Sequence, residues 1–506
     1  MAIQNYIFGP TKKQFFKTRF KQGIALTFKD VSVKTGLSEI LPSECNTTTR
    51  FSRNIKLKIP IVSAAMDTVT EHTMAILIAT MGGIGVIHKN LTPKDQAREV
   101  VRTKYYLNGM IESPICVEAG STMSKVIAMR EKEGYRFHRF PVVDENKRLC
   151  GILTKDDFDF CTGQSDKVQD NMSREVIYIN KEDGQEIAYK LMQDHKKKAI
   201  PVVDSDKRVI GMYLLSDLKR IRSGESSTQT LDEKGRLRVA AAIGAGKPAL
   251  DRFELLADAN VDCIVIDTAH GDSLAVFETI RGVREINPSI DIIAGNISEP
   301  SSAQRLINEG VDGIKVGQGP GSICTTRIIA GVGAPQVTAI YSCHVVARES
   351  NIPVCGDGGI KYSGDIVKAI AAGADTVMLG SLLAGTKEAP GEIFTSNGQM
   401  YKTYRGMGSL EAMMTNTESR NRYRQGNTPS KELIPEGVEG RVPYKGPATK
   451  KIQFYVGGLR SGMGYAGTPT IEQLKTESRF HQVTTASETE AHPSIEVTSE
   501  APNYQK

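Results

Sequence analysis

The sequence predicts an α/β fold: a TIM (β/α)8 barrel that is interrupted by an inserted module. Eight short apolar runs recur along the 506-residue chain, separated by amphipathic segments of helix length. The runs are apolar throughout rather than alternating, as expected of parallel strands that are buried on both faces. A segment between the second and third runs breaks the pattern and contains an internal repeat. A doubly wound open sheet is the alternative, and the tally of eight β-α units favours the barrel.

The predicted elements follow the chain in order. The strands are Ile59–Ser63, Ile84–His88, Val239–Ile243, Cys263–Asp267, Ile290–Ala294, Gly313–Val316, Val354–Gly356 and Thr376–Leu379. The helices between them include Glu71–Met81, Pro248–Ala259, Ser273–Asn287, Ser301–Glu309, Ala334–Ser350 and Ser363–Ala372. In such a barrel the loops after the strands form one catalytic face, so functional residues are expected there.

Composition and charge narrow the classes of protein. The 40% hydrophobic and 24% charged content is ordinary for a globular protein. No run of about 18 apolar residues is present, so no membrane span is expected. A net charge of +6 is too small to indicate nucleic-acid binding. The eight cysteines form no C-x-x-C pair and the N-terminus lacks the pattern of a secretion signal, so we expect a cytoplasmic protein.

The insertion divides the chain into residues 1–107 and 223–506, which build the barrel, and residues 108–222. Phe140-Pro-Val-Val-Asp144 and Ile200-Pro-Val-Val-Asp204 lie sixty positions apart, and each leads to a glycine, Gly151 or Gly211. A duplicated β-α-β unit cannot bury its faces alone, so the two copies are expected to pack together. A spacer or an oligomerisation module is the alternative to a binding function.

The repeat resembles a tandem pair of CBS domains, a family that often binds adenine or guanine nucleotides as regulators. The resemblance implies that a threonine and an aspartate after the glycine contact the ribose. Thr154 and Asp157 match in the first copy, whereas the second copy has Asp217 but Leu214 in place of the threonine. One nucleotide pocket is therefore better preserved than the other.

The stretch from Lys315 to Gln336 concentrates chemistry in a short loop. Gly317, Gly319 and Gly321 lead into a turn that holds Cys324. Closely spaced glycines let the backbone approach a ligand, and a thiol among hydroxyl groups and an arginine is a candidate nucleophile. A surface loop with an incidental cysteine is the alternative. A dinucleotide-binding fingerprint is set aside because the third glycine comes too early.

The barrel would bring further loops to the same face. Asp267 follows the fourth strand, Asp357-Gly358-Gly359 the seventh and Gly380-Ser381 the eighth. The last two loops have the residue types that bind phosphate in barrels, so a phosphorylated substrate with its reactive end over Cys324 is predicted. The polar stretch from Met414 to Lys451 is either a lid or a disordered loop. The tail from Glu488 would lie on the surface or reach a neighbouring subunit.

Several long motifs resemble the inosine monophosphate dehydrogenase family over essentially the whole chain. They are Pro60–Val69, Gly82–Asn90, the Cys324 loop, Asp357–Gly364, Tyr404–Ser409 and Pro435–Tyr444. The resemblance implies oxidation of inosine monophosphate (IMP) to xanthosine monophosphate with NAD, a step toward guanine nucleotides. Cys324 would form a covalent thioimidate with the purine, with Thr326 near the thiol. Arg422 and Tyr423 match the flap pair in which the arginine activates the hydrolytic water.

The same resemblance implies the binding residues. The IMP site would comprise Met66, Ser322, Asp357, Gly359, Gly380, Ser381, Tyr404, Gly406, Met407, Gly408 and Glu436. NAD would bind at Asp267, Gly317 and Gly319. A potassium ion would bind the carbonyl groups of Gly319, Gly321 and Cys324, with Glu490, Ala491 and His492 from a neighbouring subunit. Family members form tetramers that can pair into octamers, so a homotetramer is expected.

Several positions depart from the family pattern, and two other functions compete with the dehydrogenase. Gln318 replaces an aliphatic residue, Lys29 replaces an acidic one, and Cys355-Gly356 replaces an apolar pair. In the tail, Ala491 replaces a serine and the glycine usual near Ser487 is missing. Guanosine monophosphate (GMP) reductase shares the barrel and a similar cysteine loop but needs no water-activating flap. Arg422, Tyr423 and the CBS pair favour the dehydrogenase. A non-catalytic nucleotide sensor is disfavoured because Cys324 and the flap pair are present.

Overall fold

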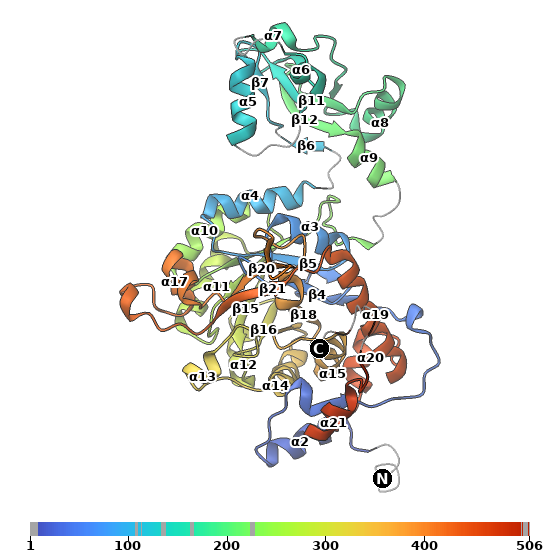
Figure 1. Ribbon diagram of the computed structural model, residues 1–506, viewed down its shortest axis with the longest axis vertical. Helices are drawn as coiled ribbons and strands as arrows, with labels where there is room; N and C mark the ends of the chain where they lie inside the picture. Colours follow the sequence, from blue (N-terminus) through green and yellow to red (C-terminus); the bar gives the residue numbers. More distant parts are fainter. Residues whose placement is uncertain are drawn as a thin grey trace. The chain divides into compact units, whose positions relative to one another are not determined.

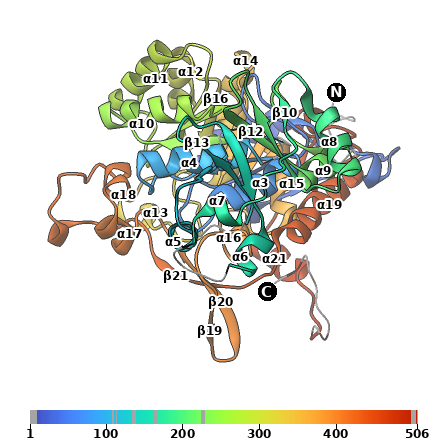
Figure 2. The same cartoon turned by 90° about the horizontal axis from the view of Figure 1, so that it is seen from above.

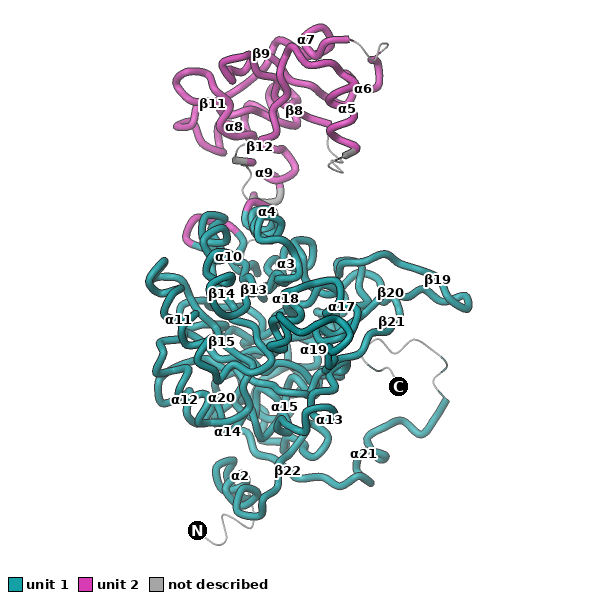
Figure 3. Tube along the Cα trace, turned by 90° about the vertical axis from the view of Figure 1, so that its left-hand side faces the viewer, with its two compact units in different colours: residues 1–104, 228–232, 237–506 teal, residues 105–227, 233–236 magenta. Residues whose placement is uncertain are grey.

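The chain forms two compact units in a computed structural model (Figure 3). The structure describes residues 9–106, 110–112, 114–132, 138–161, 166–222, 228–496, 498 and 504. Unit 1 comprises residues 1–104, 228–232 and 237–506, and unit 2 comprises residues 105–227 and 233–236. In the described part of the chain no helix combines the length and the apolar character that a bilayer crossing requires.

Unit 1 is a closed barrel of eight parallel strands, which confirms the predicted fold (Figures 1 and 2). The strands are β4 (Ile61–Ser63), β5 (Ile84–Ile87), β13 (Ala240–Ile243), β14 (Cys263–Asp267), β15 (Asp291–Ile297), β16 (Gly313–Val316), β17 (Val354–Asp357) and β18 (Thr376–Leu379). The barrel closes where β18 pairs with β4 in parallel, with Val377 opposite Ile61. Nearly every strand residue is buried, as the continuous apolar runs predict.

The helices pack around the barrel. They are α3 (His72–Thr80), α4 (Pro93–Lys104), α10 (Lys247–Asp258), α11 (Leu274–Ile286), α12 (Pro300–Asn308), α14 (Gln336–Glu349), α15 (Ser363–Ala372) and α19 (Ala448–Ala466). The six predicted helices are confirmed to within two residues at each end. In α12, small or apolar residues at helical spacing are buried, including Ser302, Ala303 and Leu306, while the rest of the surface is polar.

Strand β15 is longer than predicted because Gly295 and Asn296 belong to it rather than to a turn. A Cβ at position 295 would lie 2.4 Å from the carbonyl oxygen of Lys315 on the neighbouring strand. The glycine therefore permits close approach of two strands. The register between β15 and β16 shifts at this point, and Asn296 is buried.

A second set of elements follows the eighth strand. Strands β19 (Phe394–Ser396), β20 (Gln399–Arg405) and β21 (Glu439–Pro443) form an antiparallel sheet, and helices α17 (Leu410–Thr415) and α18 (Thr417–Arg422) lie between β20 and β21 in the chain. Near the chain ends, β1 (Val31–Val33) pairs with β22 (Phe480–Gln482), and α21 (Thr485–Ala491) follows. Thus the polar stretch from Met414 is largely ordered, in contrast to the disordered-loop alternative.

Unit 2 contains the internal repeat as two similar sheets. One sheet has the order β7 (Val117–Glu118), β8 (Phe140–Val143), β9 (Leu149–Leu153); the other has β10 (Ile179–Asn180), β11 (Ala199–Val203), β12 (Val209–Leu214), β6 (Met110–Glu112). Helices α5 (Met123–Lys132), α6 (Lys155–Asp159) and α7 (Val168–Asn171) accompany the first sheet; α8 (Gly184–Asp194) and α9 (Leu215–Arg222) accompany the second.

The two copies share detailed geometry. The hairpin register shifts between Val142 and Val143 in the first copy and between Val202 and Val203 in the second, at equivalent positions of the repeat. The hairpins also meet, because Arg148 and Arg208 form an antiparallel bridge. Each copy has its own apolar cluster, which includes Phe140 in one and Ile200 in the other.

Candidate active site

A cavity opens at the carboxyl ends of the barrel strands, and most of the predicted site residues line it. These are Met66, Asp267, Gly317, Gly319, Gly321, Ser322, Cys324, Asp357, Gly359, Gly380, Ser381, Tyr404, Met407, Arg422 and Tyr423. They come from the loops after β4, β14, β16, β17 and β18, from β20 and from the end of α18. Residues more than 300 positions apart in sequence therefore share one chamber.

Cys324 lies in a loop that is held from both sides. Its Sγ lies 3.2 Å from the hydroxyl oxygen of Thr326. The loop pairs with the segment around Gly437, since the Thr325 amide donates to the Glu436 carbonyl at 3.0 Å and the Val438 amide to the Ile323 carbonyl at 2.9 Å. The thiol thus sits on a backbone fixed at both flanks, beside a hydroxyl that is able to hydrogen-bond a thiolate.

Two of the glycines in this loop are required by their surroundings. Gly317 has φ +151°, and a Cβ there would lie 2.0 Å from the Asp357 carbonyl oxygen. Gly319 has φ +82°, and a Cβ there would lie 2.4 Å from Cγ of Arg327. Any side chain at either position would clash and would strain the backbone.

A buried lysine organises the floor of the cavity. Lys315, on β16, is 1% exposed, and its ammonium donates to Asp267 at 2.8 Å and to Asp357 at 2.9 Å. It also contacts Oδ1 of Asn296, whose amide nitrogen donates to Asp357 at 2.9 Å. We call these four residues the Lys315 cluster. Because each charge in it has a partner, the cluster holds two carboxylates at fixed positions without leaving a buried charge uncompensated.

Helix α18 delivers the flap pair to this floor. The guanidinium of Arg422 forms an ion pair with Oδ2 of Asp267, while Lys315 holds Oδ1. Tyr423 packs so closely on Gly408 that a Cβ there would lie 2.4 Å from the tyrosine ring. Burial raises the pKa of Tyr423, with a smaller opposing effect from Arg422. The phenol therefore stays protonated and is available to donate a hydrogen bond in the cavity.

A second buried lysine, Lys89, lies close to α18, the helix that carries Arg422. The ammonium of Lys89 is 4.0 Å from a carboxylate oxygen of Glu418 and donates to the Asp267 carbonyl at 3.1 Å. Burial, followed by the nearby charge of Arg422, lowers the pKa of Lys89 to about 7. Lys89 is thus a group whose charge changes near neutral pH under the segment that carries Arg422.

The opposite wall has the character of a phosphate site. Tyr404 points its hydroxyl toward Gly380, where a Cβ would lie 3.0 Å from that oxygen, and burial raises the pKa of Tyr404 to about 12. Gly359 has φ +82° in the loop before α15, and Ser381 begins a short helix, α16 (Ser381–Ala384). Backbone amides at such turns bind anionic oxygens.

The remaining predicted residues lie outside the cavity lining. Thr326, Gly406, Gly408 and Glu436 lie directly behind the wall; the amide of Glu436 donates to the Gly408 carbonyl at 3.0 Å. Ala491 and His492, with Pro320 and Arg327, line a separate hollow of the same chain. Glu490 belongs to α21. Thr154, Asp157 and Asp217 belong to unit 2.

Sequence reasoning assigned no role in the site to Lys315, Asn296 or Lys89. One signal was present: a lysine inside the apolar run Gly313–Val316 must be buried with a partner if the strand is buried on both faces. The identity of its partners could not be read, because Asp267 and Asp357 come from different strands.

The structure also accounts for two departures from the family pattern. Gln318 accepts a hydrogen bond from the Ser298 hydroxyl at 2.6 Å and donates to the Ala269 carbonyl at 3.2 Å, so it joins three loops. Lys29 forms an ion pair with Glu488, which lies in α21 of the tail. An aliphatic residue at position 318 could make neither of the glutamine contacts.

The fold and the site define the class of the protein: a (β/α)8-barrel enzyme whose cavity brings a thiol, Cys324, and an arginine, Arg422, together at the carboxyl ends of the strands. Comparison with known proteins narrows this class to a family. The model of the IMP dehydrogenase / GMP reductase domain matches residues 25–494, and the chain belongs to that family.

Relatives match it over nearly its full length. The chain is 46% identical over 491 residues to inosine-5'-monophosphate dehydrogenase of Aquifex aeolicus, which covers 96% of this chain and 98% of the relative. It is 43% identical over 484 residues to the protein of that name from Bacillus subtilis, covering 95% and 97%. A cysteine-to-alanine variant of GMP reductase from Trypanosoma brucei, solved with guanosine 5'-monophosphate, superimposes with a TM-score of 0.83 at 37% identity and covers 94% of this chain and 98% of its own.

Proposed function

We propose that this enzyme oxidises IMP to xanthosine monophosphate with NAD. The observation that carries the proposal is the placement of Arg422 and Tyr423 in the same cavity as Cys324, with Arg422 ion-paired to Asp267. A hydrolytic half-reaction needs a residue that handles water beside the covalent intermediate, and a reductase does not. The near-full-length identity to curated dehydrogenases supports the same reaction.

The proposed chemistry balances in two half-reactions. In the first, the Cys324 thiolate forms a bond to C2 of the purine, and the C2 hydrogen leaves with its electron pair. NAD supplies the hydride acceptor when bound. In the second, water adds to C2 of the thioimidate, the bond between Sγ and C2 breaks, and the thiol is regenerated. One IMP, one NAD⁺ and one water thus give one xanthosine monophosphate, one NADH and one proton.

The carboxylate of Asp267 fits both halves of this cycle. One oxygen is held by Lys315, and the other faces Arg422. An acidic side chain at a strand end is the usual acceptor for a ribose hydroxyl of NAD. Since the guanidinium of Arg422 occupies the space beside Oδ2 that a ribose hydroxyl would need, we infer that Arg422 reaches Asp267 only after NADH has left.

Arg422 is then placed to orient the hydrolytic water. Its guanidinium is mostly buried and lies near Asp267, Lys89 and Tyr423. The Asp267 carboxylate fixes the direction of the guanidinium, and Tyr423 is able to donate a hydrogen bond to the attacking oxygen. These groups would therefore hold a water molecule beside the covalent intermediate.

The IMP-binding residues remain part of the proposal. The ribose phosphate would lie against Ser322, Asp357, Gly359, Gly380, Ser381 and Tyr404, and the purine against Met66, Gly406, Met407, Gly408 and Glu436. The turn at Gly359 and the buried hydroxyl of Tyr404 support the phosphate assignment. Gly317 and Gly319, which line the cavity, would border NAD.

The decisive experiment is a comparison of two assays on the purified full-length chain. NADH formation from IMP and NAD, followed by absorbance, is expected. Activity confined to GMP with NADPH would contradict the proposal and favour the reductase. The inserted module does not separate the two, because the T. brucei reductase aligns over 94% of this chain, module included. The CBS pair therefore no longer favours the dehydrogenase, and the flap pair carries the distinction.

We further propose that unit 2 is a CBS module that binds adenine or guanine nucleotides. A pocket in it is lined by Thr154 and by three basic residues, Arg139, Lys197 and Lys198, which suit phosphate groups. Asp157 accepts hydrogen bonds from the Thr154 amide and hydroxyl at 2.6 and 2.9 Å, and Asp217 is its counterpart in the second copy. Titration of turnover with ATP and with GTP tests this, and the absence of binding by calorimetry would contradict it.

Three finer points complete the proposal. Potassium would bind the carbonyl groups of Gly319, Gly321 and Cys324, with Glu490, Ala491 and His492 from the tail; oxygen-rich glycine turns suit such a cation. A homotetramer would bring a neighbour's tail to this loop. A cytoplasmic location is supported by the eight cysteines, none of which is joined in a disulfide. Turnover with potassium replaced by sodium, and sedimentation of the full chain, test the first two.

A further inference from the structure

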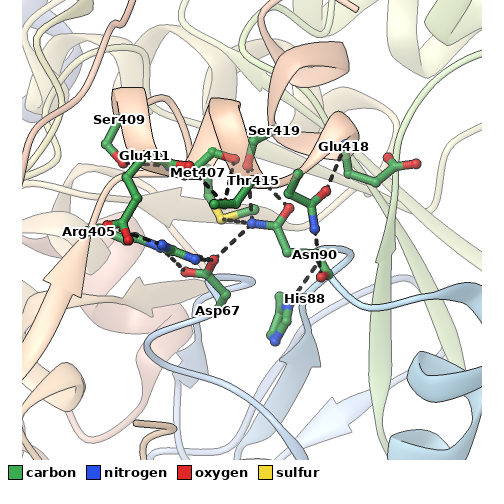
Figure 4. Close-up of polar contacts among 12 residues, drawn as sticks. Asp67, His88, Asn90, Arg405, Met407, Ser409, Glu411, Thr415, Glu418 and Ser419 are labelled. Atoms are coloured by element: carbon green, nitrogen blue, oxygen red, sulfur yellow. Dashed lines mark hydrogen bonds and ion pairs between the residues drawn. The ribbon is translucent and has the colours of Figure 1, made fainter.

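One asparagine, Asn90, joins helix α18 to the barrel (Figure 4). It lies in the loop after β5, and its side-chain nitrogen donates to Oδ2 of Asp67 at 2.9 Å. The hydroxyl oxygen of Ser419, on α18, lies 3.1 Å from that nitrogen and 3.2 Å from the amide oxygen of Asn90. Both polar atoms of the Asn90 amide are thereby engaged, and each of them lies within hydrogen-bond distance of Ser419 on α18.

The backbone of Asn90 holds the same helix at its start. Asn416 donates from its side-chain nitrogen to the Asn90 carbonyl at 2.7 Å. The side-chain oxygen of Asn416 accepts from the Glu418 amide at 2.8 Å and so caps α18. Asn90 therefore contacts α18 twice, at its cap and in its first turn.

Asp67 extends the contact to the neighbouring sheet. Arg405, at the end of β20, donates to Oδ2 of Asp67 at 2.8 Å, the oxygen that also accepts from Asn90. These contacts thus connect loops of the barrel to α18 and to β20. We call the four residues involved the Asn90 cluster: Asn90, Asp67, Arg405 and Ser419. Ser419 is fully buried, so water cannot replace the contacts that its hydroxyl would lose.

The geometry of α18 connects this cluster to the chemistry. Arg422 follows Ser419 by three residues, so the two lie about one helical turn apart. Fixing Ser419 against the barrel thus fixes the direction in which Arg422 leaves the helix, toward Asp267. Among the described residues that line the cavity, Asn90 does not appear. It reaches the cavity through its neighbours, which are α18 with Arg422 and Met407, whose sulfur lies 3.6 Å from the side-chain nitrogen of Asn90.

We propose that Asn90 is a positioning residue for the hydrolytic half-reaction, because it holds α18 where Arg422 reaches Asp267. The inference rests on the proposed function, in which Arg422 and NAD compete for that carboxylate. Loss of the Asn90 amide shifts this competition toward NAD. Glu418 still contacts Arg252 at 3.4 Å, so α18 keeps a second attachment and the effect is partial.

The test is pre-steady-state NADH formation by Asn90→Ala with IMP and NAD. The rate and amplitude of the first NADH turnover are expected to stay within about twofold of wild type. The following steady rate is expected to fall about tenfold, the loss of roughly 1.4 kcal/mol of positioning. Inhibition by excess NAD should set in at about tenfold lower concentration. The reason is that Arg422 would occupy Asp267 for a smaller fraction of the time and so leave it available to NAD. A general loss of structure would not tighten NAD inhibition.

Two further variants keep the test decisive. Ser419→Ala removes only the flap side of the contact and should shift the same two quantities in the same direction by a smaller factor. Asn54→Ala is the matched control: Asn54 donates to Asp291 at 2.7 Å at the start of β15, the opposite end of the barrel, and should leave the ratio of burst to steady rate unchanged.

The outcomes separate the two proposals. Equal losses in burst and steady rate, or unchanged NAD inhibition in both Asn90→Ala and Ser419→Ala, would overturn the positioning role while leaving the dehydrogenase intact. Wild-type protein that forms no NADH from IMP would overturn the proposed function itself. If Asn90→Ala does not fold, Ser419→Ala alone decides, since the serine hydroxyl acts on α18 through this contact with Asn90.

Discussion

The Lys315 cluster contains Asp267, the Asn90 cluster holds the helix whose Arg422 pairs with Asp267, and the two clusters are built differently. Every member of the Lys315 cluster belongs to a strand of the barrel, from β14 to β17. The Asn90 cluster joins barrel loops to α18 and β20, which are not barrel strands. The first is held by the barrel's own hydrogen bonds, whereas the second exists only while α18 is docked. The contrast indicates a fixed floor beneath a segment that is able to leave.

The largest effect is expected from replacing the proposed nucleophile, Cys324. Cys324→Ala removes the group that bonds to the purine, so turnover should fall by at least about 10⁴-fold, close to loss of measurable activity. The measurement is NADH formation at saturating IMP and NAD. Nucleotide binding to unit 2 should persist as the internal control. Turnover within about tenfold of wild type would contradict the nucleophile assignment.

The flap arginine should separate the two half-reactions. Arg422→Ala leaves hydride transfer in place but removes the group beside the water, so the steady rate should fall by about 10²–10⁴ while the first NADH turnover persists. Rapid-mixing absorbance measures both. A burst that disappears together with the steady rate would place Arg422 in the first half-reaction.

The floor of the cavity should matter for stability more than a surface ion pair does. Lys315→Met leaves Asp267 and Asp357 without their shared cation, which should lower the free energy of unfolding by about 3–5 kcal/mol. Urea denaturation checks this against Lys29→Met, whose partner Glu488 is at the surface and whose loss should leave the midpoint unchanged. Equal midpoints for the two variants would remove the contrast between floor and surface.

A smaller effect is expected in the pH dependence of stability, through Lys89 beside α18. The folded state lowers the pKa of Lys89 to about 7, from an unfolded value near 10.5. Between these values the unfolded chain binds more protons, so the Lys89 contribution to stability rises with pH, by at most about 1.4 kcal/mol per unit. Comparison of urea midpoints at about pH 7 and about pH 9 should show a steeper rise for wild type than for Lys89→Met. Parallel slopes would show that Lys89 keeps its ordinary pKa.

The barrel could be predicted from the sequence because each of its strands leaves a local pattern. A strand that is buried on both faces must be a continuous apolar run, and eight such runs leave few architectures. The same logic located Asp267 and Asp357 at strand ends and Cys324 in the loop after the sixth strand. The extension of β15 through Gly295 and Asn296 was missed because a glycine beside a polar residue is also a turn signal.

The Asn90 cluster and the sheet of strands β19 to β21 could not be predicted from the sequence, for a different reason. The residues of β21 are mostly exposed and carry no apolar pattern. Asn90, Asp67 and Ser419 are ordinary polar residues whose partners lie 23 and 329 positions away. The segment around Glu418 was too charged to be read as core, yet Ser419 within it is fully buried. Such pairings depend on tertiary contacts that no local periodicity encodes.

The bridge between Arg148 and Arg208 in unit 2 has a consequence for its origin. The two positions are equivalent within the sixty-residue repeat, so each copy presents the same surface to the other. Such a self-complementary contact is the one that two identical chains make about a two-fold axis. A duplication has joined in one chain what a dimer of single copies would form. Once linked, each half is free to change alone, as Leu214 shows opposite Thr154.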